Sequence, residues 1–309
     1  MINFLRKYGL ILQIVLTIAA LIYFGFKLKD DIHPLIVFIK DRPINFFTFF
    51  LSFFFLFGYY LIATEFWRRL INLCGERVDF KLALKLFSFS QFGKYLPGRI
   101  WVILGRTQMA PTHGLNPLVI TVSSSIEQFF ILASGLFYIP FVFPAYSSSG
   151  LILYYLAFFS ILLLCSRRLR PYLDKIAKKY VKPSIVERFS TSRILAFLLG
   201  YILAWGIFGI GFYLFLTSFT PLGWGFYPVA VGSFVVSWVF GILSIFTPGG
   251  LGVREGVLIA TLQGWLGSVV ALGVSMGSRI WLVLSEICFF FFVLILLGKK
   301  KNKLPTKSF

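Results

Sequence analysis

Eight charged side chains lie within or beside long apolar segments of the sequence, where unpaired charges are rare. They are Lys94, Arg99, Arg106, Glu127, Arg254, Glu255, Arg279 and Glu286. An unpaired charge at the centre of a membrane-spanning helix costs about 2.5–3.5 kcal/mol, so eight lipid-facing charges would cost on the order of 20 kcal/mol. We therefore expect these residues to face a protein interior or a hydrated cavity, to pair with one another, or to lie near the membrane surface.

Two of the apolar segments are broken by a Pro-Gly step that a basic residue follows. The first break reads GKYLPGR over residues 93–99, and the second reads TPGGLGVREG over residues 247–256. The amino-terminal end of a helix presents free N–H groups and a positive dipole, which favour an anion. Arginine also binds phosphate oxygens through two parallel hydrogen bonds. The breaks therefore predict a phosphate-binding site that includes Lys94, Arg99 and Arg254.

A simpler interpretation is equally open, in which Arg99 and Arg254 only hold the breaks in place by pairing with Glu255 and Glu127. Glu286 is expected nearer the inner membrane surface and carries less weight. Proline ends a helix and glycine permits a tight turn. The turns are therefore expected at Pro97, Gly98, Pro248, Gly249, Gly250 and Gly252.

An acid and a base occupy equivalent positions downstream of the two breaks. Glu127 follows Pro97 by 30 residues, and Arg279 follows Pro248 by 31. In inverted repeats these two side chains are expected to meet near the axis that relates the halves, where Arg279 would join the phosphate site. Glu127 and Glu255 would then position the arginines or carry coupling protons. Alternatively, Glu127 and Arg279 form a buried ion pair that only specifies assembly.

The composition is that of an integral membrane protein. Of the 309 residues, 58% are hydrophobic and 13% are charged, against about a quarter charged in soluble domains. The net charge of +19 would suggest nucleic acid in a soluble chain. In this chain it predicts basic cytoplasmic loops that contact anionic lipid headgroups, and no nucleic-acid partner.

Neither a metal site nor a cofactor is expected. The three cysteines are far apart, and the only histidines, His33 and His113, lack partners at metal-site spacing. The glycines of residues 250–256 lack both the GxGxxG spacing and the preceding strand of a nucleotide site. Gly273 and Gly277 form a GxxxG pair, which is typical of close helix packing.

The predicted fold class is an all-α polytopic membrane protein with about six transmembrane helices and two opposed re-entrant hairpins. A crossing needs about 17–25 residues. The expected spans are Gly9–Phe26, Ile44–Phe66, Leu115–Phe143, Leu151–Cys165, Ile194–Phe219 and Ser268–Leu297. The broken segments Leu82–Leu104 and Val229–Trp265 are expected to be the hairpins, entering from opposite sides and turning at the Pro-Gly breaks.

Positive charge predicts that both termini lie in the cytoplasm. Residues 167–193 hold nine Lys and Arg, the tail after Gly298 holds five lysines, and residues 218–227 hold no charge. Only an odd number of crossings then fits between residues 218 and 299, so the second hairpin is expected to enter from the outer face. The alternative is that Val229–Phe246 is an ordinary span.

A single membrane domain, residues 1–309, is therefore expected in the cytoplasmic membrane, and a homo-oligomer is compatible with the sequence. Its parts are two inverted-topology repeats over 44–143 and 194–297, a basic cytoplasmic loop over 166–193 and a basic tail over 298–309. Inverted repeats place broken helices near the membrane midplane, where many transporters bind substrate.

Three strings resemble the flippase-like membrane family: GKYLPGR at 93–99, SSSIEQ at 123–128 and TPGGLGVREG at 247–256. The best-known member of that family is the transmembrane half of lysylphosphatidylglycerol synthase, the multiple peptide resistance factor. The resemblance covers essentially the whole chain and implies a protein that moves lipids with charged headgroups between leaflets. By this resemblance, the residues that match the family's first hairpin are Lys94, Pro97, Gly98 and Arg99, and those that match its second hairpin are Pro248, Gly249, Gly250, Gly252, Arg254 and Glu255. No soluble aminoacyl-transferase domain follows the last apolar run, so we expect no lysine transfer to lipid.

Translocation of a phospholipid, an aminoacyl-phospholipid or a polyprenyl-phosphate-linked lipid is thus the predicted function, and the protein is not expected to be an enzyme. No ATPase motif is present, so a gradient or downstream consumption would supply the driving force. The alternative is an integral-membrane transferase acting on a lipid phosphate, with Glu127 or Glu255 as general base. A transporter of neutral solutes is disfavoured because the site would be strongly cationic.

Overall fold

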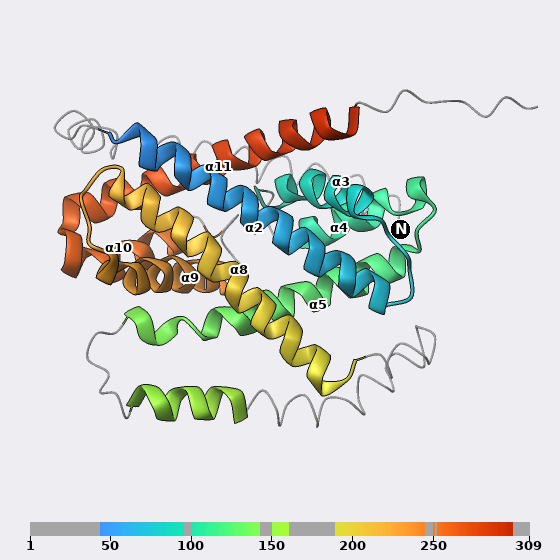
Figure 1. Ribbon diagram of the computed structural model, residues 1–309, viewed down its shortest axis with the longest axis horizontal. Coiled ribbons are helices and arrows are strands. Elements are labelled where there is room, and N and C mark those ends of the chain that lie inside the picture. Colours follow the sequence, from blue (N-terminus) through green and yellow to red (C-terminus); the bar gives the residue numbers. More distant parts are fainter. Residues whose placement is uncertain are drawn as a thin grey trace, which may run out of the picture.

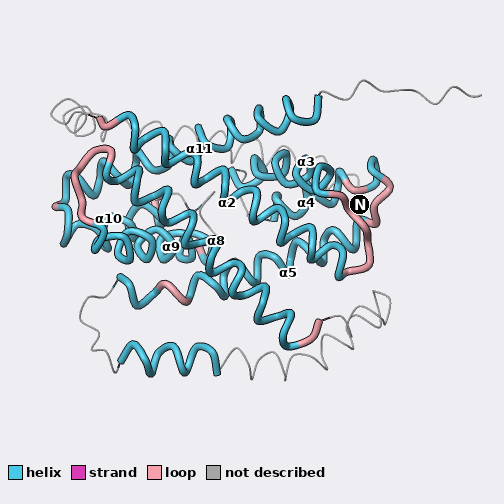
Figure 2. The backbone as a smooth tube through the Cα atoms, in the orientation of Figure 1, coloured by secondary structure: helices cyan, strands magenta, loops and turns pink. Residues whose placement is uncertain are grey.

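The computed structural model describes residues 44–95, 100–142, 150–160, 189–244, 250 and 252–298, and this part of the chain contains helices and loops but no strand (Figure 2). The long helices are α2 (Phe46–Leu73), α5 (Pro117–Leu136), α8 (Thr191–Thr217) and α11 (Ser268–Gly298). Shorter helices are α3 (Phe80–Ser90), α4 (Ile100–Met109), α9 (Tyr227–Leu243), α10 (Val253–Leu266) and an apolar helix over Gly150–Ser160. The 3₁₀ turns are η1 (Gln91–Tyr95), η2 (Pro111–His113), η3 (Ile139–Val142) and η4 (Trp224–Phe226).

Within the described residues, five helical segments are long and apolar enough to cross a membrane: Phe46–Leu73, Pro117–Leu136, Thr191–Thr217, Trp224–Leu243 and Ser268–Leu297. The predicted class, an all-helical membrane protein, is thereby confirmed. The segment Trp224–Leu243 covers the first arm of the predicted second hairpin. The other four segments match predicted spans. The predicted span Gly9–Phe26 lies outside the described residues, as does the end of Leu151–Cys165.

Asparagine and serine side chains fix the starts of three long helices. The Asn45 side chain accepts a hydrogen bond from the Thr48 amide at 3.3 Å, and Asn116 accepts one from the Leu118 amide at 2.9 Å. At α8, Ser190 accepts one from the Arg193 amide at 3.4 Å. Each cap satisfies an amide that the first helical turn leaves without a partner.

The helices that open the two halves, α2 and α8, pack against each other in antiparallel orientation (Figure 1). The Asn45 amide, at the start of α2, donates to the Ser218 carbonyl at the end of α8 over 2.9 Å. Ring contacts continue along the pair, from Tyr59 against Phe208 at 5.2 Å to Phe66 against Tyr201 at 5.4 Å. This pair forms the middle of the molecule.

Both broken segments fold as antiparallel helical pairs, at opposite ends of α2 and α8 (Figure 1). We call the α3–η1–α4 pair hairpin one and the α9–α10 pair hairpin two. At the open end of hairpin one, the Lys85 ammonium lies 3.1 Å from the His113 ring. At the open end of hairpin two, Phe226 contacts Trp265 at 5.9 Å.

The end of α9, next to the break in hairpin two, lies beside the middle of α8. Trp238, five residues before the end of α9, contacts Trp205 at 5.0 Å, and Trp205 lies midway along α8. In hairpin two, Gly250 has φ +73°, and an added Cβ there would lie 2.9 Å from the Gly241 backbone. Only glycine fits this close approach.

Contacts between elements repeat from one half to the other. In each half, the first long helix contacts the first hairpin arm, the two arms contact each other, and the second arm contacts the last helix. The last helix of each half also contacts the first arm of the other hairpin, α5 with α9 and α11 with α3. The second hairpin is thus the counterpart of the first.

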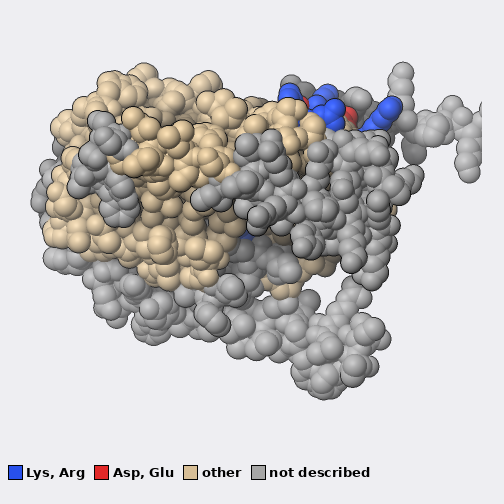
Figure 3. Space-filling view, turned by 90° about the horizontal axis from the view of Figure 1, so that it is seen from below, with Lys and Arg blue, Asp and Glu red and all other residues tan. Residues whose placement is uncertain are grey.

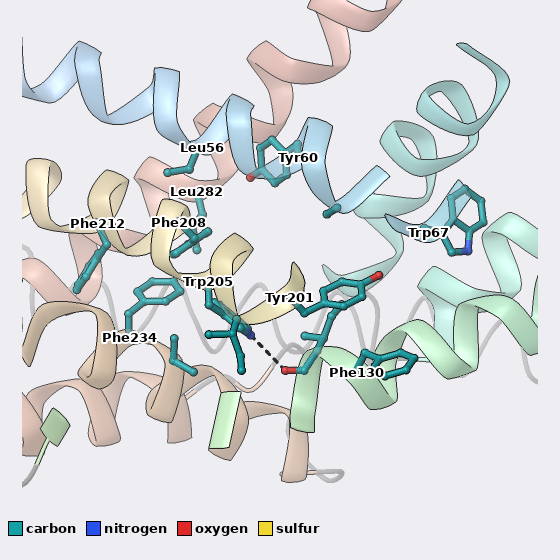
Figure 4. Packing of buried hydrophobic residues seen from close by; sticks show 14 of the residues in the cluster. Leu56, Tyr60, Trp67, Phe130, Tyr201, Trp205, Phe208, Phe212, Phe234 and Leu282 are labelled. Atoms are coloured by element: carbon teal, nitrogen blue, oxygen red, sulfur yellow. Dashed lines mark hydrogen bonds between the residues drawn. The ribbon is translucent and has the colours of Figure 1, made fainter. Parts of the chain in front are cut away.

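An aromatic core joins α2, α8, α9 and α11 (Figure 4). Phe208 packs against Phe234 at 4.5 Å, and Trp281 stacks on Phe215 at 5.0 Å. The tryptophan N–H groups in this core are satisfied, since Trp205 donates to the Ile131 carbonyl at 3.2 Å and Trp281 donates to the Ser52 hydroxyl at 2.8 Å. Buried indoles need such acceptors, so these bonds add specificity to the packing.

On the face drawn in Figure 3, the exposed charged side chains of the described residues gather at one end. The end of α2, the start of α3 and the turn between them expose Arg69, Arg77, Asp79 and Lys81. The loop from Ser218 to Tyr227, at the opposite end of α8, carries no charge. The two ends of the molecule therefore differ in the way that two membrane surfaces would require.

Replacement of Gly211 by alanine is expected to destabilise the α2–α8 contact. An added Cβ would lie 2.6 Å from Leu56 and 3.0 Å from the Ser52 carbonyl oxygen. Overpacking of this kind costs about 1–3 kcal/mol. A thermal unfolding series in detergent should show a lower midpoint for Gly211→Ala, while Gly223→Ala, with open space around its added Cβ, should match the parent. Equal midpoints for the two variants would contradict the close approach.

Candidate functional site

One face of α11 carries charged groups that bind both hairpins. Arg279 forms an ion pair with Glu255 at the start of α10, and Glu286 forms one with Lys94 in η1. Seven residues separate Arg279 from Glu286, which places them on nearly the same side of the helix, about 10 Å apart along its axis. Charged residues from both sequence breaks therefore meet on a single helix.

The Glu286 carboxylate is the centre of a buried polar cluster. Its side chain is 2% exposed, whereas that of its partner Lys94 is 32% exposed. The Tyr60 hydroxyl, midway along α2, donates to Glu286 at 3.4 Å and lies 3.0 Å from the Ser285 hydroxyl. The Lys94 ammonium is thus the more exposed member of the pair, and the pair lies beside the middle of α2.

The Glu255 carboxylate closes the start of α10. One oxygen accepts the Gly252 amide at 2.7 Å, and the other pairs with the Arg279 guanidinium. Gly252 has φ +83°, which a residue with a side chain rarely adopts, so glycine is required where the chain enters α10. Ser275 adds a hydrogen bond to the Glu255 carbonyl at 3.3 Å. Glu255 therefore joins the tip of hairpin two to α11.

Arg254 lies over an aromatic ring of the same hairpin. Its guanidinium carbon is 4.6 Å from the centroid of the Phe234 ring, and that ring is almost fully buried. A cation over an aromatic face is attracted by the ring quadrupole, more strongly where water is excluded. The guanidinium is therefore held between the two arms of hairpin two, next to the turn.

A third ion pair is fully buried in the first half. Arg106 of α4 and Glu127 of α5 pair with each other, and each is 1% exposed. The Arg106 guanidinium also donates to the Ser90 hydroxyl at 3.0 Å and lies 4.0 Å from the Trp67 ring centroid. Trp67 in turn donates to Ser124 at 3.1 Å. This cluster joins α2, α3, α4 and α5.

The expected meeting of Glu127 with Arg279 is wrong. Glu127 pairs with Arg106, and Arg279 pairs with Glu255, so each pair lies within one half. The physical reason is that the second arm of each hairpin packs directly on the helix that follows it, α4 on α5 and α10 on α11. A charged side chain on the second arm therefore pairs with a residue of the helix that follows that arm in the same half.

The simpler interpretation, in which Glu127 and Glu255 pair with Arg99 and Arg254, is corrected for the same reason. Both acids instead bind a local arginine, on α4 and on α11. Glu286, expected near the inner membrane surface, contacts Tyr60 at the middle of α2 and pairs with Lys94 of hairpin one. The signal in the sequence was the seven-residue spacing from Arg279, together with Ser278 and Ser285 at the same spacing.

Several predicted site residues lie outside the described part of the chain: Pro97, Gly98, Arg99, Pro248 and Gly249. Lys94, Arg254 and Arg279 are described. Lys94 pairs with Glu286 of α11, and Arg279 lies on the same face of α11, where it pairs with Glu255. Among the described residues, no group of three or more His, Cys, Asp or Glu could hold a metal ion.

Comparison with known proteins found no matching protein-family model, no matching curated protein and no matching solved structure.

The variant Arg106→Leu is expected to lower the free energy of unfolding by about 3–5 kcal/mol, because it leaves the Glu127 carboxylate buried and unpaired. The double variant Arg106→Leu/Glu127→Leu removes both charges and should recover most of that loss. As a control, Arg69→Leu should cost less than about 1 kcal/mol, since the Arg69–Glu65 pair is on the surface. Denaturation in detergent measures all three. A double variant as unstable as the single one would contradict the role of the ion pair.

Proposed function

We propose that this protein is a lipid translocator that moves a lipid with an anionic phosphate headgroup between membrane leaflets. The observation that carries the proposal is the meeting of charged residues from two broken, half-depth helical hairpins on one face of α11. Charged residues at such depth are costly and commonly mark the pathway of a substrate or an ion.

Hairpin one enters the membrane from the cytoplasmic face in this proposal, and hairpin two enters from the opposite face. The positively charged end of the molecule, beside the open end of hairpin one, supports this orientation. The short arms also support it, since α3 and α4 have 11 and 10 residues and α10 has 14. The halves are then inverted repeats. Trp224–Leu243 is long enough for a full crossing, but α10 returns beside it to the same end.

The arrangement can pass a phosphate along α11. Lys94, Arg279 and Arg254 supply cations to which phosphate oxygens bind well. An acid beside a cation keeps that cation charged at low dielectric, and a headgroup phosphate can replace the acid as its counter-ion. A step from the Lys94 ammonium, beside Glu286, to the Arg279 guanidinium, about two helical turns away along α11, would carry the headgroup through the midplane, while the hydrocarbon chains stay in the bilayer.

The resemblance to the flippase-like membrane family supports the same function, because two of its three strings supply residues of the site and the third supplies the acid of the buried Arg106–Glu127 pair. GKYLPGR contains Lys94, SSSIEQ contains Glu127, and TPGGLGVREG contains Arg254 and Glu255. Membership of that family is accordingly part of the proposal.

Removal of the Arg254 guanidinium should slow lipid movement without unfolding the protein. A charge-assisted hydrogen bond contributes about 1.5–3 kcal/mol, so Arg254→Ala should reduce the rate at least about tenfold. Purified protein in proteoliposomes containing a headgroup-labelled phospholipid, with Arg69→Ala as a matched surface control, provides the measurement. An unchanged rate in Arg254→Ala would refute the proposed site. Covalent change of the labelled lipid would instead favour a transferase.

The orientation is open to a cysteine-accessibility test. In a chain whose native cysteines are replaced, Gly223→Cys should react with a membrane-impermeant maleimide in intact cells, because Gly223 is exposed at the uncharged end. Lys81→Cys should react only after permeabilisation. Ser244→Cys, at the end of α9, should react slowly from either side. Rapid labelling of Ser244→Cys from the cytoplasmic side would mean that α9 crosses the membrane completely.

A further inference from the structure

Phenylalanine rings line the surface where hairpin one meets α11. We define this surface as the η1–α11 seam, made up of Phe89, Phe92, Lys94, Ile287, Phe290 and Phe291. Phe290 makes edge contacts with Phe89 at 4.9 Å and with Phe92 at 5.3 Å. Phe89 and Phe92 are each 36% exposed, and Phe291 is 56% exposed. The outer surface of the seam is therefore apolar and aromatic.

The polar group that reaches this apolar surface is a cation. Of the Lys94–Glu286 pair, the lysine is the exposed member, and the carboxylate lies behind it against Tyr60 and Ser285. The backbone that carries Lys94 is fixed, because Gly93 packs so closely on Trp101 that an added Cβ would lie 2.8 Å from the Trp101 carbonyl. Among the described residues, Lys94 thus places a positive charge, paired with Glu286, level with the middle of α2 and beside exposed aromatic rings.

The equivalent contact in the other half is closed. There α5 meets α9 through Gly135, whose added Cβ would lie 3.0 Å from Val239 and 3.2 Å from Val235. Both valines are buried, and neither carries a charge. The two halves therefore differ at this contact, which is ionic and open to the outside at hairpin one and apolar and packed at hairpin two.

We propose that the η1–α11 seam is the lateral entrance through which a lipid with a phosphate headgroup reaches the α11 site, with Lys94 as its first contact. This inference rests on the proposed function and identifies where its substrate enters. The phosphate binds the Lys94 ammonium, and a hydrocarbon chain lies along the rings of Phe89, Phe92 and Phe290. A free phosphate ion would not reach a cation that apolar rings flank at half depth, so the occupant is a lipid.

Photo-crosslinking of lipids in proteoliposomes tests this entrance. A benzophenone amino acid replaces Phe92, and in a separate protein it replaces Phe54, which is 71% exposed on α2. Each protein receives trace radiolabelled phosphatidylglycerol or, in parallel, radiolabelled diacylglycerol with the same chains. At position 92 we expect phosphatidylglycerol to be captured about tenfold more than diacylglycerol, as one charge-assisted contact allows. At position 54 the two lipids should be captured equally.

The double variant Lys94→Gln/Glu286→Gln removes the cation without leaving a buried carboxylate unpaired, and Lys94→Arg keeps the charge. The preference at position 92 should fall to about one in the first and persist in the second, since only the cation distinguishes the two lipids. Equal capture of both lipids at position 92 in the otherwise unchanged protein would overturn the entrance. So would an undiminished preference in the double variant.

Translocation measured in the same proteoliposomes separates this inference from the proposed function. Normal lipid movement together with equal capture of both lipids would refute the entrance and leave the translocator intact. Selective capture without any lipid movement would refute the translocator and leave the seam as a binding site for a lipid phosphate.

Discussion

The charged face of α11 is the constraint on which the described architecture depends. Arg279 and Glu286 each hold the tip of one hairpin through an ion pair, to Glu255 and to Lys94. Separation of either pair would leave a charge in a poorly solvated interior, which costs far more than an exposed pair contributes. Both hairpins are therefore joined to the same helix by ion pairs.

The two halves share a pattern of contacts but differ in chemistry. In the first half the arginine is on the hairpin arm and the acid is on the long helix, as Arg106 and Glu127. In the second half the acid is on the arm and the arginine is on the long helix, as Glu255 and Arg279. The first of these pairs is fully buried and acts structurally, whereas the second is partly exposed beside Arg254. The two pairs of the approximate repeat thus differ both in polarity and in burial.

Composition and pattern predicted much of the fold. The apolar runs gave the long helices, because 20 or so apolar residues have few other stable arrangements. The Pro-Gly breaks predicted the antiparallel pairing of α3 with α4 and of α9 with α10, since a helix rarely continues through a Pro-Gly step. The pairing of Glu127 and the central place of Glu286 were missed. Both depend on which turn of one helix faces which turn of another.

The sequence by itself determined the helical class, the positions of the breaks and the set of costly charges, because these follow from local apolarity and from the backbone limits of proline and glycine. Only the tertiary structure decided how those charges combine. Ion pairs act over a few ångströms, and packing of each hairpin on its neighbouring helix sets those distances. For this reason Arg106 pairs with Glu127, Arg279 pairs with Glu255, and α11 is the helix that contacts both hairpins.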